Sequence, residues 1–429
     1  MARFARLSDW LAWLEGLHPK AIDLGLDRIG RVWQRLGAPA IAAEVVTVAG
    51  TNGKGSSVAM LDAILGAAGY KVGRFTSPHF VRFNERVVVA GREVDDLRLI
   101  DAFERIDQAR GGISLSYFEF TALAAFLCFA DAGLDVVLLE VGLGGRLDAV
   151  NIIDADVALI TAIDLDHQDW LGNDREAIGR EKAGILRAGR VAVCSDPNPP
   201  ASVAERAKEI GATLLCLGPD YQFVKEGETW DWSAPGRRWA GLPKPALPGR
   251  FQMDNAAGVL AVIATLKHEV SRAAIERGLR SVHWPGRWQV VDGVVPVVLD
   301  VAHNPHSAGG LASQLAEQPT ARTLAVCGML RTKDVVGVLK IMQPHIDAWF
   351  PVNLPSPLGL DVEAMRAHLD ALPVAAPVMN CDNVEQALQV ARDRATPGDR
   401  ILVFGSFVTV EQAMRVLDAA PSPSSQSSE

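Results

Sequence analysis

The chain has 429 residues and a formal net charge of −9 at pH 7. Because single hydrophobic cores usually stop growing at about 250–300 residues, this length predicts two domains. The basic residues are spread along the chain and form no run that could follow a phosphate backbone, so we expect no nucleic-acid partner. No apolar run approaches the roughly 18 residues that cross a bilayer, so we expect no membrane-spanning segment.

The range Met1–Lys20 predicts an amphipathic helix of the mature protein. Leu7, Trp10 and Leu14 follow a helical period, and Glu15 interrupts any signal-peptide core. The cysteines are far apart and form no C-x-x-C pair; they are Cys128, Cys194, Cys216, Cys327 and Cys381. Their surroundings are typical of buried strands and helices, which predicts reduced core thiols and a cytoplasmic protein.

Short β-branched runs alternate with helical patterns from Val45 onward, which is typical of parallel strands joined by crossover helices. The expected strands are Val45–Ala49, Val72–Phe75, Val136–Val141, Val157–Thr161, Val191–Cys194 and Leu214–Leu217. The expected helices are Ser57–Ala68, Asp96–Gln108, Phe120–Ala130 and Glu176–Leu186. Tyr221–Leu242, with tryptophans among Gly, Pro and charged residues, predicts a hairpin or an irregular insert. The first domain is therefore expected to be α/β with a mostly parallel sheet.

A second β-α series follows the helical patterns Asn255–Lys267 and Arg272–Leu279 and the Pro- and Gly-containing stretch His283–Val291, a candidate hinge. Its expected strands are Val295–Leu299, Thr323–Cys327, Ala348–Val352 and Ile401–Phe404. We therefore predict a larger domain at residues 1–287 and a smaller, doubly wound α/β domain at 288–420. Residues 421–429 are rich in Ser and Pro and are expected to be a disordered tail.

A glycine-rich turn lies between the first predicted strand and the helix that follows it. It consists of Gly50, Thr51, Asn52, Gly53, Lys54, Gly55, Ser56 and Ser57. Such a turn directs backbone N–H groups and the positive end of a helix dipole at one anion, which predicts a P-loop. Lys54 would add charge at the β- and γ-phosphates, and Ser56 or Ser57 a hydroxyl near the metal. The alternative is a tight turn with an exposed lysine.

The turn departs from the general P-loop pattern. Val48 stands where that pattern has its first glycine, and Gly55 separates Lys54 from the hydroxyl residues. These departures argue against the loop of a standard GTPase or kinase.

Three polar stretches follow predicted strands and are candidate Mg²⁺ ligands, because Mg²⁺ prefers oxygen and ligands in open α/β sheets bind at the carboxyl ends of strands. Glu140 precedes the turn Gly142–Arg146, Asp164–Asp169 contains His167, and Ser77 begins Ser-Pro-His. For Glu140 the alternative is a carboxylate that caps a neighbouring helix. For His167 it is a solvated loop histidine, and Ser77 read alone lies in a simple turn.

Motifs along nearly the whole chain resemble those of folylpolyglutamate synthases in the Mur ligase superfamily, specifically the bifunctional bacterial dihydrofolate synthase/folylpolyglutamate synthases. The motifs are His18–Leu26, Ala49–Ser56, Thr76–His79, Phe83–Arg86, Tyr117–Phe120, Glu140–Asp148, Asp166–His167, Glu181–Gly184, Pro285–Arg287, Asp300–Pro305 and Gly405–Phe407. Val301 departs from the glycine usual in this family. The resemblance implies an ATP-dependent ligase that activates a carboxylate as an acyl phosphate and joins it to L-glutamate.

The resemblance also implies roles for single residues. Magnesium would be held by Ser77, Glu140 and His167, and Lys54, Glu140, His167 and Lys182 would form the catalytic set. The nucleotide would also contact Asn255, at a helix start, and Arg287, Asp300 and His303 of the second domain. The pterin-bearing substrate would contact Arg82, Phe118 and Asp148. Lys182 is a candidate for carbamylation by CO₂; the alternative is an unmodified lysine that pairs with Glu181 or phosphate. Asp300 and Asn304 could instead cap the helix that follows them.

Two other functions remain as alternatives. A Mur ligase acting on a UDP-linked muramyl substrate would need an amino-terminal UDP-binding domain, whereas the loop begins about fifty residues into the chain. A nucleotide-dependent switch protein would need a guanine-selecting Asn-Lys-x-Asp motif, which the sequence lacks. The expected partners are therefore small molecules, namely ATP, L-glutamate and a pterin or folate, and the protein is expected to be a monomer.

Overall fold

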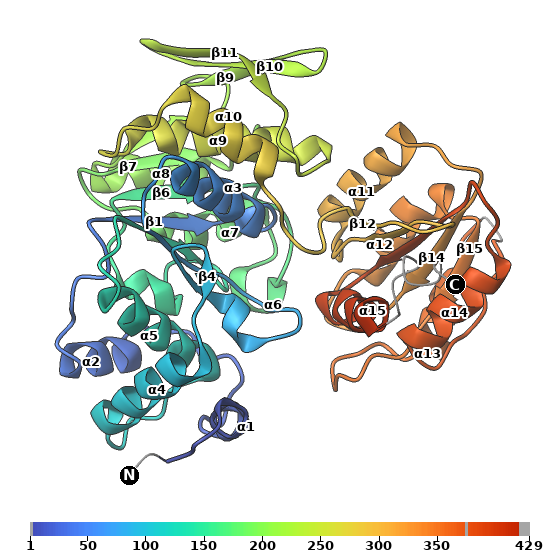
Figure 1. Cartoon of the computed structure of the whole chain (residues 1–429), viewed down its shortest axis with the longest axis horizontal. Helices are drawn as coiled ribbons and strands as arrows, with labels where there is room; N and C mark the ends of the chain where they lie inside the picture. The colour runs from blue at the N-terminus through green and yellow to red at the C-terminus, as the bar shows by residue number, and fades with distance from the viewer. Residues whose placement is uncertain (1–2, 374–375, 420–429) are drawn as a thin grey trace, which may run out of the picture. The chain divides into compact units, whose positions relative to one another are not determined.

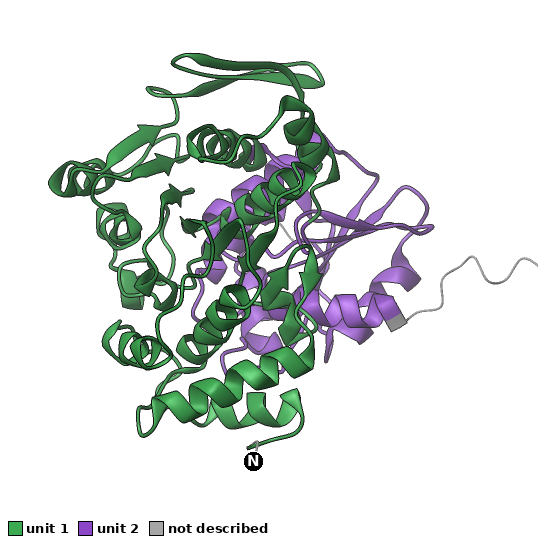
Figure 2. Ribbon diagram, turned by 60° about the vertical axis from the view of Figure 1, so that its left-hand side comes forward, with its two compact units in different colours: residues 1–246, 251–283 green, residues 247–250, 284–429 purple. Residues whose placement is uncertain are grey.

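The computed structural model describes residues 3–373 and 376–419, so the predicted tail at 421–429 lies outside the described residues. The chain forms two compact units (Figure 2). Unit 1 comprises residues 1–246 and 251–283, and unit 2 comprises residues 247–250 and 284–429. Each unit contains its own sheet, so the two are described separately.

Within the described residues, unit 1 has a sheet of eight strands in the order β4-β3-β2-β5-β1-β6-β7-β8. The strands are β1 Glu44–Ala49, β2 Val72–Phe75, β3 Val87–Val89, β4 Arg92–Glu93, β5 Val136–Glu140, β6 Val157–Ile160, β7 Val191–Cys194 and β8 Thr213–Cys216. The six predicted strands are confirmed and run parallel, whereas β3 and β4 add an antiparallel edge. Strands β1, β5 and β6 are buried along their whole length, which explains their near-continuous apolar sequences.

The helices of unit 1 cover this sheet. They are α1 Leu7–Glu15, α2 Asp27–Arg35, α3 Lys54–Ala67, α4 Asp96–Arg110, α5 Tyr117–Ala130, α6 Gln168–Leu171, α7 Arg175–Lys182, α8 Ala201–Ile210, α9 Arg250–Thr265 and α10 Arg272–Ser281, with short 3₁₀ turns at Phe83–Arg86, Ala149–Ile152 and Ala183–Ile185. Figure 1 shows α2, α4 and α5 on one side of the sheet and α9 and α10 on the other. Helix α5 is apolar on nearly every side because it packs between α4 and the sheet.

Two predictions about helices are wrong in detail. The amino-terminal helix is α1 alone, and it ends at Glu15, so that residues 16–26 lie outside any helix or strand. Asn255 does not lie at a helix start, because α9 begins at Arg250 and Asn255 is more than one turn inside it. In both cases the apolar period indicated a helix, but helix ends are less well defined by such a period than helix type.

The predicted hairpin insert is confirmed as an antiparallel sheet of three strands within the described residues, in the order β11-β10-β9. The strands are β9 Gln222–Glu226, β10 Thr229–Ala234 and β11 Arg237–Pro243. The indole N–H of the buried Trp232 donates to the carbonyl of Ala257 at 3.0 Å, so a hydrogen bond links the insert to α9.

In the described part of unit 2, five strands form a second sheet in the order β12-β13-β16-β14-β15. The strands are β12 Gln289–Val291, β13 Val297–Leu299, β14 Thr323–Cys327, β15 Ala348–Pro351 and β16 Arg400–Phe404. The helices are α11 Pro305–Glu317, α12 Val335–Met342, α13 Val362–Asp370, α14 Val384–Arg394 and α15 Phe407–Ala419, with a 3₁₀ turn at Gln343–His345. All neighbours are parallel except β12 and β13, which agrees with a smaller α/β domain.

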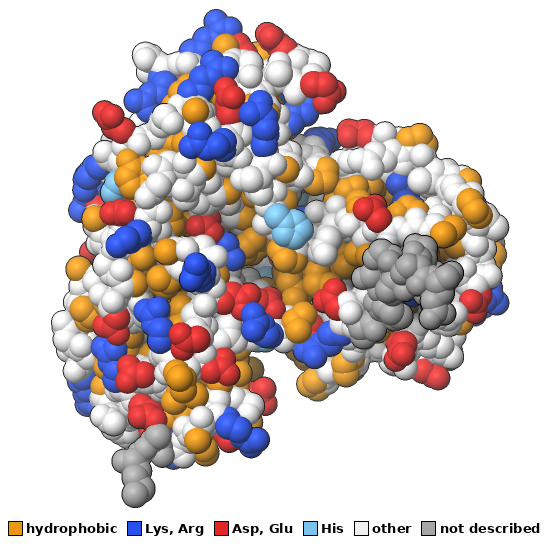
Figure 3. Space-filling model, viewed as in Figure 1, with side chains coloured by type: hydrophobic (Ala, Val, Ile, Leu, Met, Phe, Trp, Pro, Cys, Tyr) orange, Lys and Arg blue, Asp and Glu red, His pale blue; other side chains and the backbone are white. Residues whose placement is uncertain are grey.

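Among the described residues, no helix combines the length and apolarity that a bilayer crossing requires. All five cysteines lie in described ranges and are free thiols, four of them buried and Cys216 half-buried. On the face of unit 1 seen at the left of Figure 3, acidic and basic side chains are interspersed and form no single-sign field on that face.

Candidate active site

Four neighbouring strands of unit 1 carry the predicted phosphate loop and the predicted metal ligands at their carboxyl ends. In the sheet order β2-β5-β1-β6, Ser77 follows β2, Glu140 ends β5, the loop at residues 50–57 follows β1, and His167 follows β6. The register pairs Val48 with Glu140. Since parallel strands end at the same edge, the sheet brings these groups to one side of unit 1.

The loop at residues 50–57 has the backbone form that an anion site needs. Gly53 adopts a φ of 91°, a left-handed conformation that favours glycine, and precedes the first turn of α3. A Cβ at Gly53 would lie 2.4 Å from Asn255 Oδ1, so there is no room for a side chain. Lys54 Nζ donates to the carbonyl of Gly50 at 2.9 Å and lies 3.4 Å from that of Thr51. The ammonium group is therefore held over its own loop.

Thr161, one residue beyond β6, forms a hydrogen bond with this loop. No role was predicted for it from the sequence. Its Oγ1 lies 2.7 Å from the carbonyl of Asn52 and 3.2 Å from that of Ala49. A Cβ at Gly50 would come within 1.8 Å of the same oxygen, so Gly50 is the residue that permits the contact. The sequence indicated only that the predicted strand Val157–Thr161 ends on a polar residue. Threonines with a purely structural role are also common at such positions, so this pattern does not identify a contact with the loop.

We expect Thr161→Val to weaken nucleotide binding while the fold is kept. Valine has the same shape, but it cannot donate to the Asn52 carbonyl, and the loss of one buried hydrogen bond predicts a roughly tenfold weaker affinity for ADP. Titration calorimetry with ADP measures this change, and Thr161→Ser, which keeps the hydroxyl, is the matched control. An unchanged affinity in Thr161→Val would show that the loop does not depend on this contact.

The first turn of α3 also packs against α9. Gln252 Nε2 donates to Ser56 Oγ at 3.2 Å, and Asn255 Nδ2 donates to Gln252 Oε1 at 3.1 Å. Gln252, Asn255, Ser56 and Ser57 are all buried. Asn255 thus lies against the loop, and its predicted contact with adenine stays a prediction. Gln252 is a second residue that sequence reasoning missed, since a glutamine inside a helix carries no distinctive pattern.

The structure joins two of the three predicted metal ligands. The backbone N–H of Ser77 donates to Oε2 of the buried Glu140 at 3.1 Å, so the two residues are adjacent. His167 adopts a left-handed φ of 52° at the start of α6, and its side chain is 45 % exposed. Its ring lies 3.9 Å from Asp166 Oδ1. Hydroxyl, carboxylate and imidazole donors fit a divalent cation such as Mg²⁺ or Mn²⁺.

Lys182 is buried at the end of α7, near charges from three other parts of unit 1. Its burial, together with the positive charge of Lys54, lowers its pKa to about 7, although Asp166 and Asp148 act in the opposite direction. A substantial fraction of the amine is therefore neutral at physiological pH. A neutral buried amine is a nucleophile, which is the state that reaction with CO₂ requires.

The three predicted substrate residues occupy different environments. Phe118, in the first turn of α5, has its ring 5.7 Å from that of Phe75, and a Cβ at Gly142 would lie 2.6 Å from it. Asp148 accepts from the N–H groups of Leu143 and Val150 at 2.8 and 3.0 Å, so it also closes the Gly142–Asp148 turn. Its burial raises its pKa to about 6.

Arg82 differs from Phe118 and Asp148, because its side chain is 66 % exposed and paired with Glu93 of β4. The structure thus shows an ion pair on the surface of unit 1 at this position. Its predicted contact with substrate stays a prediction.

Within unit 2, two of the three predicted nucleotide residues, Arg287 and His303, lie near Phe407. The guanidinium of Arg287 lies 5.6 Å from the ring of Phe407, and the ring of His303 lies 6.1 Å from it. Asp300 accepts from the N–H groups of Trp288 and Ala302, both at 2.9 Å. Burial raises the pKa of Asp300, whereas Arg287 lowers it.

The capping alternative is confirmed for Asn304 and is wrong for Asp300. Asn304 caps α11, since its Oδ1 accepts from Ser307 N at 2.9 Å. Asp300 instead binds backbone groups before that helix. The nucleotide roles of the three unit 2 residues stay predictions.

Comparisons with known proteins point to one family. The model of the Mur ligase middle domain matches residues 48–263, and that of the Mur ligase glutamate ligase domain matches residues 286–407. The chain is 46 % identical over 414 residues to the dihydrofolate synthase/folylpolyglutamate synthase of Escherichia coli strain K12, covering 96 % of each chain.

Solved structures agree with this result. An E. coli structure described as FolC in complex with DHPP and ADP superposes with a TM-score of 0.93 at 45 % identity, covering 97 % of this chain and 98 % of that one. A bifunctional folylpolyglutamate synthase/dihydrofolate synthase with Mn, AMPPNP and L-glutamate bound superposes with a TM-score of 0.90 at 44 % identity, covering 96 % and 98 %.

Proposed function

Because this chain belongs to the Mur ligase family, among the dihydrofolate synthases/folylpolyglutamate synthases, we propose that it is an ATP-dependent ligase that adds L-glutamate to dihydropteroate, to reduced folates, or to both. The observation that carries this proposal is the phosphate loop of unit 1 at the same sheet edge as Ser77, Glu140 and His167. The UDP-muramyl alternative is not favoured, since relatives that match over nearly the whole chain are named as folate enzymes.

The first chemical step is the activation of a carboxylic acid. A carboxylate is a poor acyl donor because oxide would have to leave, and transfer of the γ-phosphoryl group of ATP gives an acyl phosphate with a good leaving group. Such a transfer depends mainly on positioning and charge neutralisation. The loop amides and Lys54 would supply both, since the start of a helix directs its first amide groups at an anion and Lys54 is the first residue of α3.

A divalent cation, proposed to be Mg²⁺, would be held by Ser77, Glu140 and His167. When bound, it would neutralise charge on the phosphate oxygens. The hydrogen bond from the backbone N–H of Ser77 orients the carboxylate of Glu140. The relative with bound Mn, AMPPNP and L-glutamate supports a cation of this class.

Lys182 is proposed to react with CO₂ to form a carbamate. The C–N bond forms between the neutral Nζ and the carbon of CO₂, and the proton released from nitrogen passes to solvent. The product carries a negative charge near Lys54, so the modification replaces a like-charge repulsion with an attraction, whereas the charges of Asp166 and Asp148 act against it.

The second chemical step needs no protein nucleophile. The amine of glutamate attacks the acyl phosphate, and the tetrahedral intermediate collapses with loss of phosphate to give the amide. Water competes for the same acyl phosphate, so exclusion of water from the substrate favours ligation. We place this reaction in the cytoplasm, where five free cysteines would remain reduced.

A phosphate-release assay with ATP and L-glutamate tests the proposed function. We expect release, with glutamate incorporated into product, in the presence of dihydropteroate or tetrahydrofolate, and none with a UDP-muramyl substrate. Comparing the two pterin compounds shows whether one or both are used. A response to the UDP-muramyl substrate, with none to either pterin compound, would overturn the proposal in favour of the Mur-type reaction.

A further inference from the structure

His167 lies in the loop that joins β6 to α7 and contains α6, and the phosphate loop holds the beginning of this His167 loop. The backbone N–H of Thr51 donates to the carbonyl of Ala162 at 2.7 Å. The hydroxyl of Thr51 donates to the carbonyl of Asp164 at 2.9 Å and accepts from the N–H of the same residue at 3.0 Å. The phosphate loop therefore fixes one side of the chain just before His167.

The His167 loop is exposed where it carries the imidazole. Leu165 and Trp170 are 40 % and 46 % exposed, and Leu171 is the only buried residue among the four of α6. Exposed side chains contribute little packing energy, so the position of such a loop depends on the hydrogen bonds at its ends. The place of the His167 imidazole therefore depends on the groups that hold the chain on either side.

A buried carboxylate beyond the neighbouring strand holds the same stretch from the other side. Asp196 follows β7, which pairs with β6, and its side chain is only 5 % exposed. Its Oδ2 accepts from the N–H of Ile163 at 2.7 Å, and its Oδ1 accepts from the N–H of Asn198 at 2.8 Å. Asp196 thus joins the end of β7 to the first residues of the His167 loop.

Arg175, the first residue of α7, completes this arrangement. Its Nη2 lies 3.1 Å from Asp196 Oδ2 and donates to the carbonyl of Asn198 at 2.8 Å. Its Nε donates to the carbonyl of Ile163 at 2.9 Å. The N–H of Ile163 is therefore bound by Asp196, and its carbonyl is bound by Arg175. Because the guanidinium is a rigid planar fork, these contacts set the direction in which the chain leaves β6.

We propose that Arg175 and Asp196 are positioning residues that hold the His167 loop where its imidazole can bind the divalent cation. This inference rests on the metal site of the proposed function, and it deepens it by adding two residues that act through a ligand. Asp196 and the Nε and Nη2 groups of Arg175 bind protein groups, so neither residue is itself a ligand in this account. Loss of the pair should weaken cation binding and leave the phosphate loop able to bind nucleotide.

Binding of Mn²⁺ to Asp196→Asn in the presence of ADP tests this role, with free Mn²⁺ measured by electron paramagnetic resonance. Asparagine keeps the shape of the side chain, but it has one acceptor oxygen in place of two and no charge to pair with Arg175. We expect the Kd for Mn²⁺ to rise roughly tenfold, which is typical when a group that orients a metal ligand is lost. The Kd for ADP in the absence of a cation should be unchanged.

A double variant with His167→Ala separates positioning from a general loss of stability. His167→Ala removes the imidazole and should by itself weaken Mn²⁺ binding. If Asp196 acts through His167, adding Asp196→Asn should raise the Kd no further, whereas the effects of independent residues would add. An unchanged Mn²⁺ affinity in folded Asp196→Asn, or a full additional loss in the double variant, would overturn the positioning role.

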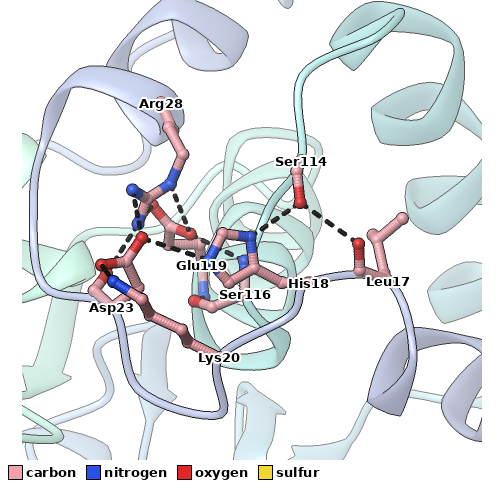
Figure 4. Close-up of polar contacts among 8 residues, drawn as sticks. All are labelled: Leu17, His18, Lys20, Asp23, Arg28, Ser114, Ser116 and Glu119. Carbon is pink, nitrogen blue, oxygen red and sulfur yellow. Dashed lines mark hydrogen bonds and ion pairs between the residues drawn. The ribbon is translucent and has the colours of Figure 1, made fainter.

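Glu119→Gln is the matched control, because Glu119 is also a buried carboxylate of unit 1 that pairs with an arginine (Figure 4). Its side chain is 4 % exposed, lies 3.2 Å from Arg28 and accepts from the N–H of Ser116 at 2.7 Å. We expect this variant to lose thermal stability, as Asp196→Asn does, but to keep the wild-type Kd for Mn²⁺. An equal loss of Mn²⁺ affinity in both variants would overturn the role, since a general loosening of unit 1 would then explain it.

If thermal denaturation shows that Asp196→Asn does not fold, Arg175→Lys is used in its place, because the Arg175 side chain is 34 % exposed and lysine keeps the charge. The same rise in Kd is expected, since an ammonium group lacks the fork that binds Ile163, Asp196 and Asn198 together. A Kd for Mn²⁺ that His167→Ala leaves unchanged would overturn this inference while the ligase function stands. Wild-type protein that binds Mn²⁺ through His167 but carries out no pterin-dependent ligation would overturn the proposed function alone.

Discussion

Lys54→Met is expected to reduce kcat/KM for ATP by roughly a thousandfold or more, with the fold intact. Methionine keeps most of the length and apolar character of the side chain but lacks the charge that lies 2.9 Å from the Gly50 carbonyl, within the loop. The transition state of phosphoryl transfer carries its charge on phosphate oxygens, and loss of one preorganised cation raises its free energy more than that of the bound ground state. Initial rates of ATP- and pterin-dependent phosphate release measure the effect.

The control for this variant is Lys208→Met, which removes the charge of an exposed lysine on α8 and should leave the rate unchanged. Thermal denaturation of both variants checks that they are folded. If Lys54→Met retained substantial ligation while folded, the loop would not be the phosphate site, and the proposed mechanism would have to be abandoned.

Lys182→Met is expected to inactivate the enzyme and, at the same time, to stabilise it. The folded state lowers the pKa of Lys182 from 10.5 to about 7, so folding disfavours the protonated amine. The resulting cost is largest below pH 7, is of order 4 kcal/mol near neutral pH, and disappears as the pH rises towards the pKa of the unfolded chain. Methionine removes this cost. By the same linkage, the unfolding free energy of the variant should exceed that of wild type most at about pH 6–7 and only slightly near about pH 10.

Chemical denaturation of wild type and Lys182→Met at several pH values, in buffers free of CO₂, measures this difference. The sign follows from proton uptake: between the two pKa values the unfolded chain binds more protons, so the wild-type stability rises with pH. The loss of activity is expected to be roughly a hundredfold or more, comparable with removing a general catalytic group.

Carbamylation makes a separate prediction for the wild-type protein. Addition of ¹³C-bicarbonate should give a carbamate resonance that is absent from Lys182→Met, and activity should depend on bicarbonate. A variant that is less stable than wild type at pH 7 would show that the ammonium group is stabilised in the fold, contrary to the lowered pKa. A wild-type spectrum without the carbamate signal would restrict Lys182 to the unmodified role.

Much of the fold and the site could be predicted because the relevant signals are local in the chain. Apolar runs and helical periods indicated the six parallel strands of unit 1, and the glycine-rich turn after Val45–Ala49 indicated a candidate phosphate site. Ser77, Glu140 and His167 each follow such a run, and parallel strands joined by crossover helices end at one edge. The antiparallel strands β3 and β4 were missed because two or three residues carry too little pattern.

The sequence by itself determined the class of the fold, the loop and the set of candidate side chains, since each depends on residues close together in the chain. Only the tertiary structure decided which groups meet. The sheet order brings β5 between β2 and β1 and so places Glu140 beside Ser77, and it brings Thr161 under the loop. Burial beside Lys54 is what makes the amine of Lys182 a weak base. Such contacts join residues that are tens to hundreds of positions apart in the chain. Electrostatic and hydrogen-bond energies depend on distance in space and on exclusion of water, and the local pattern of residues specifies neither.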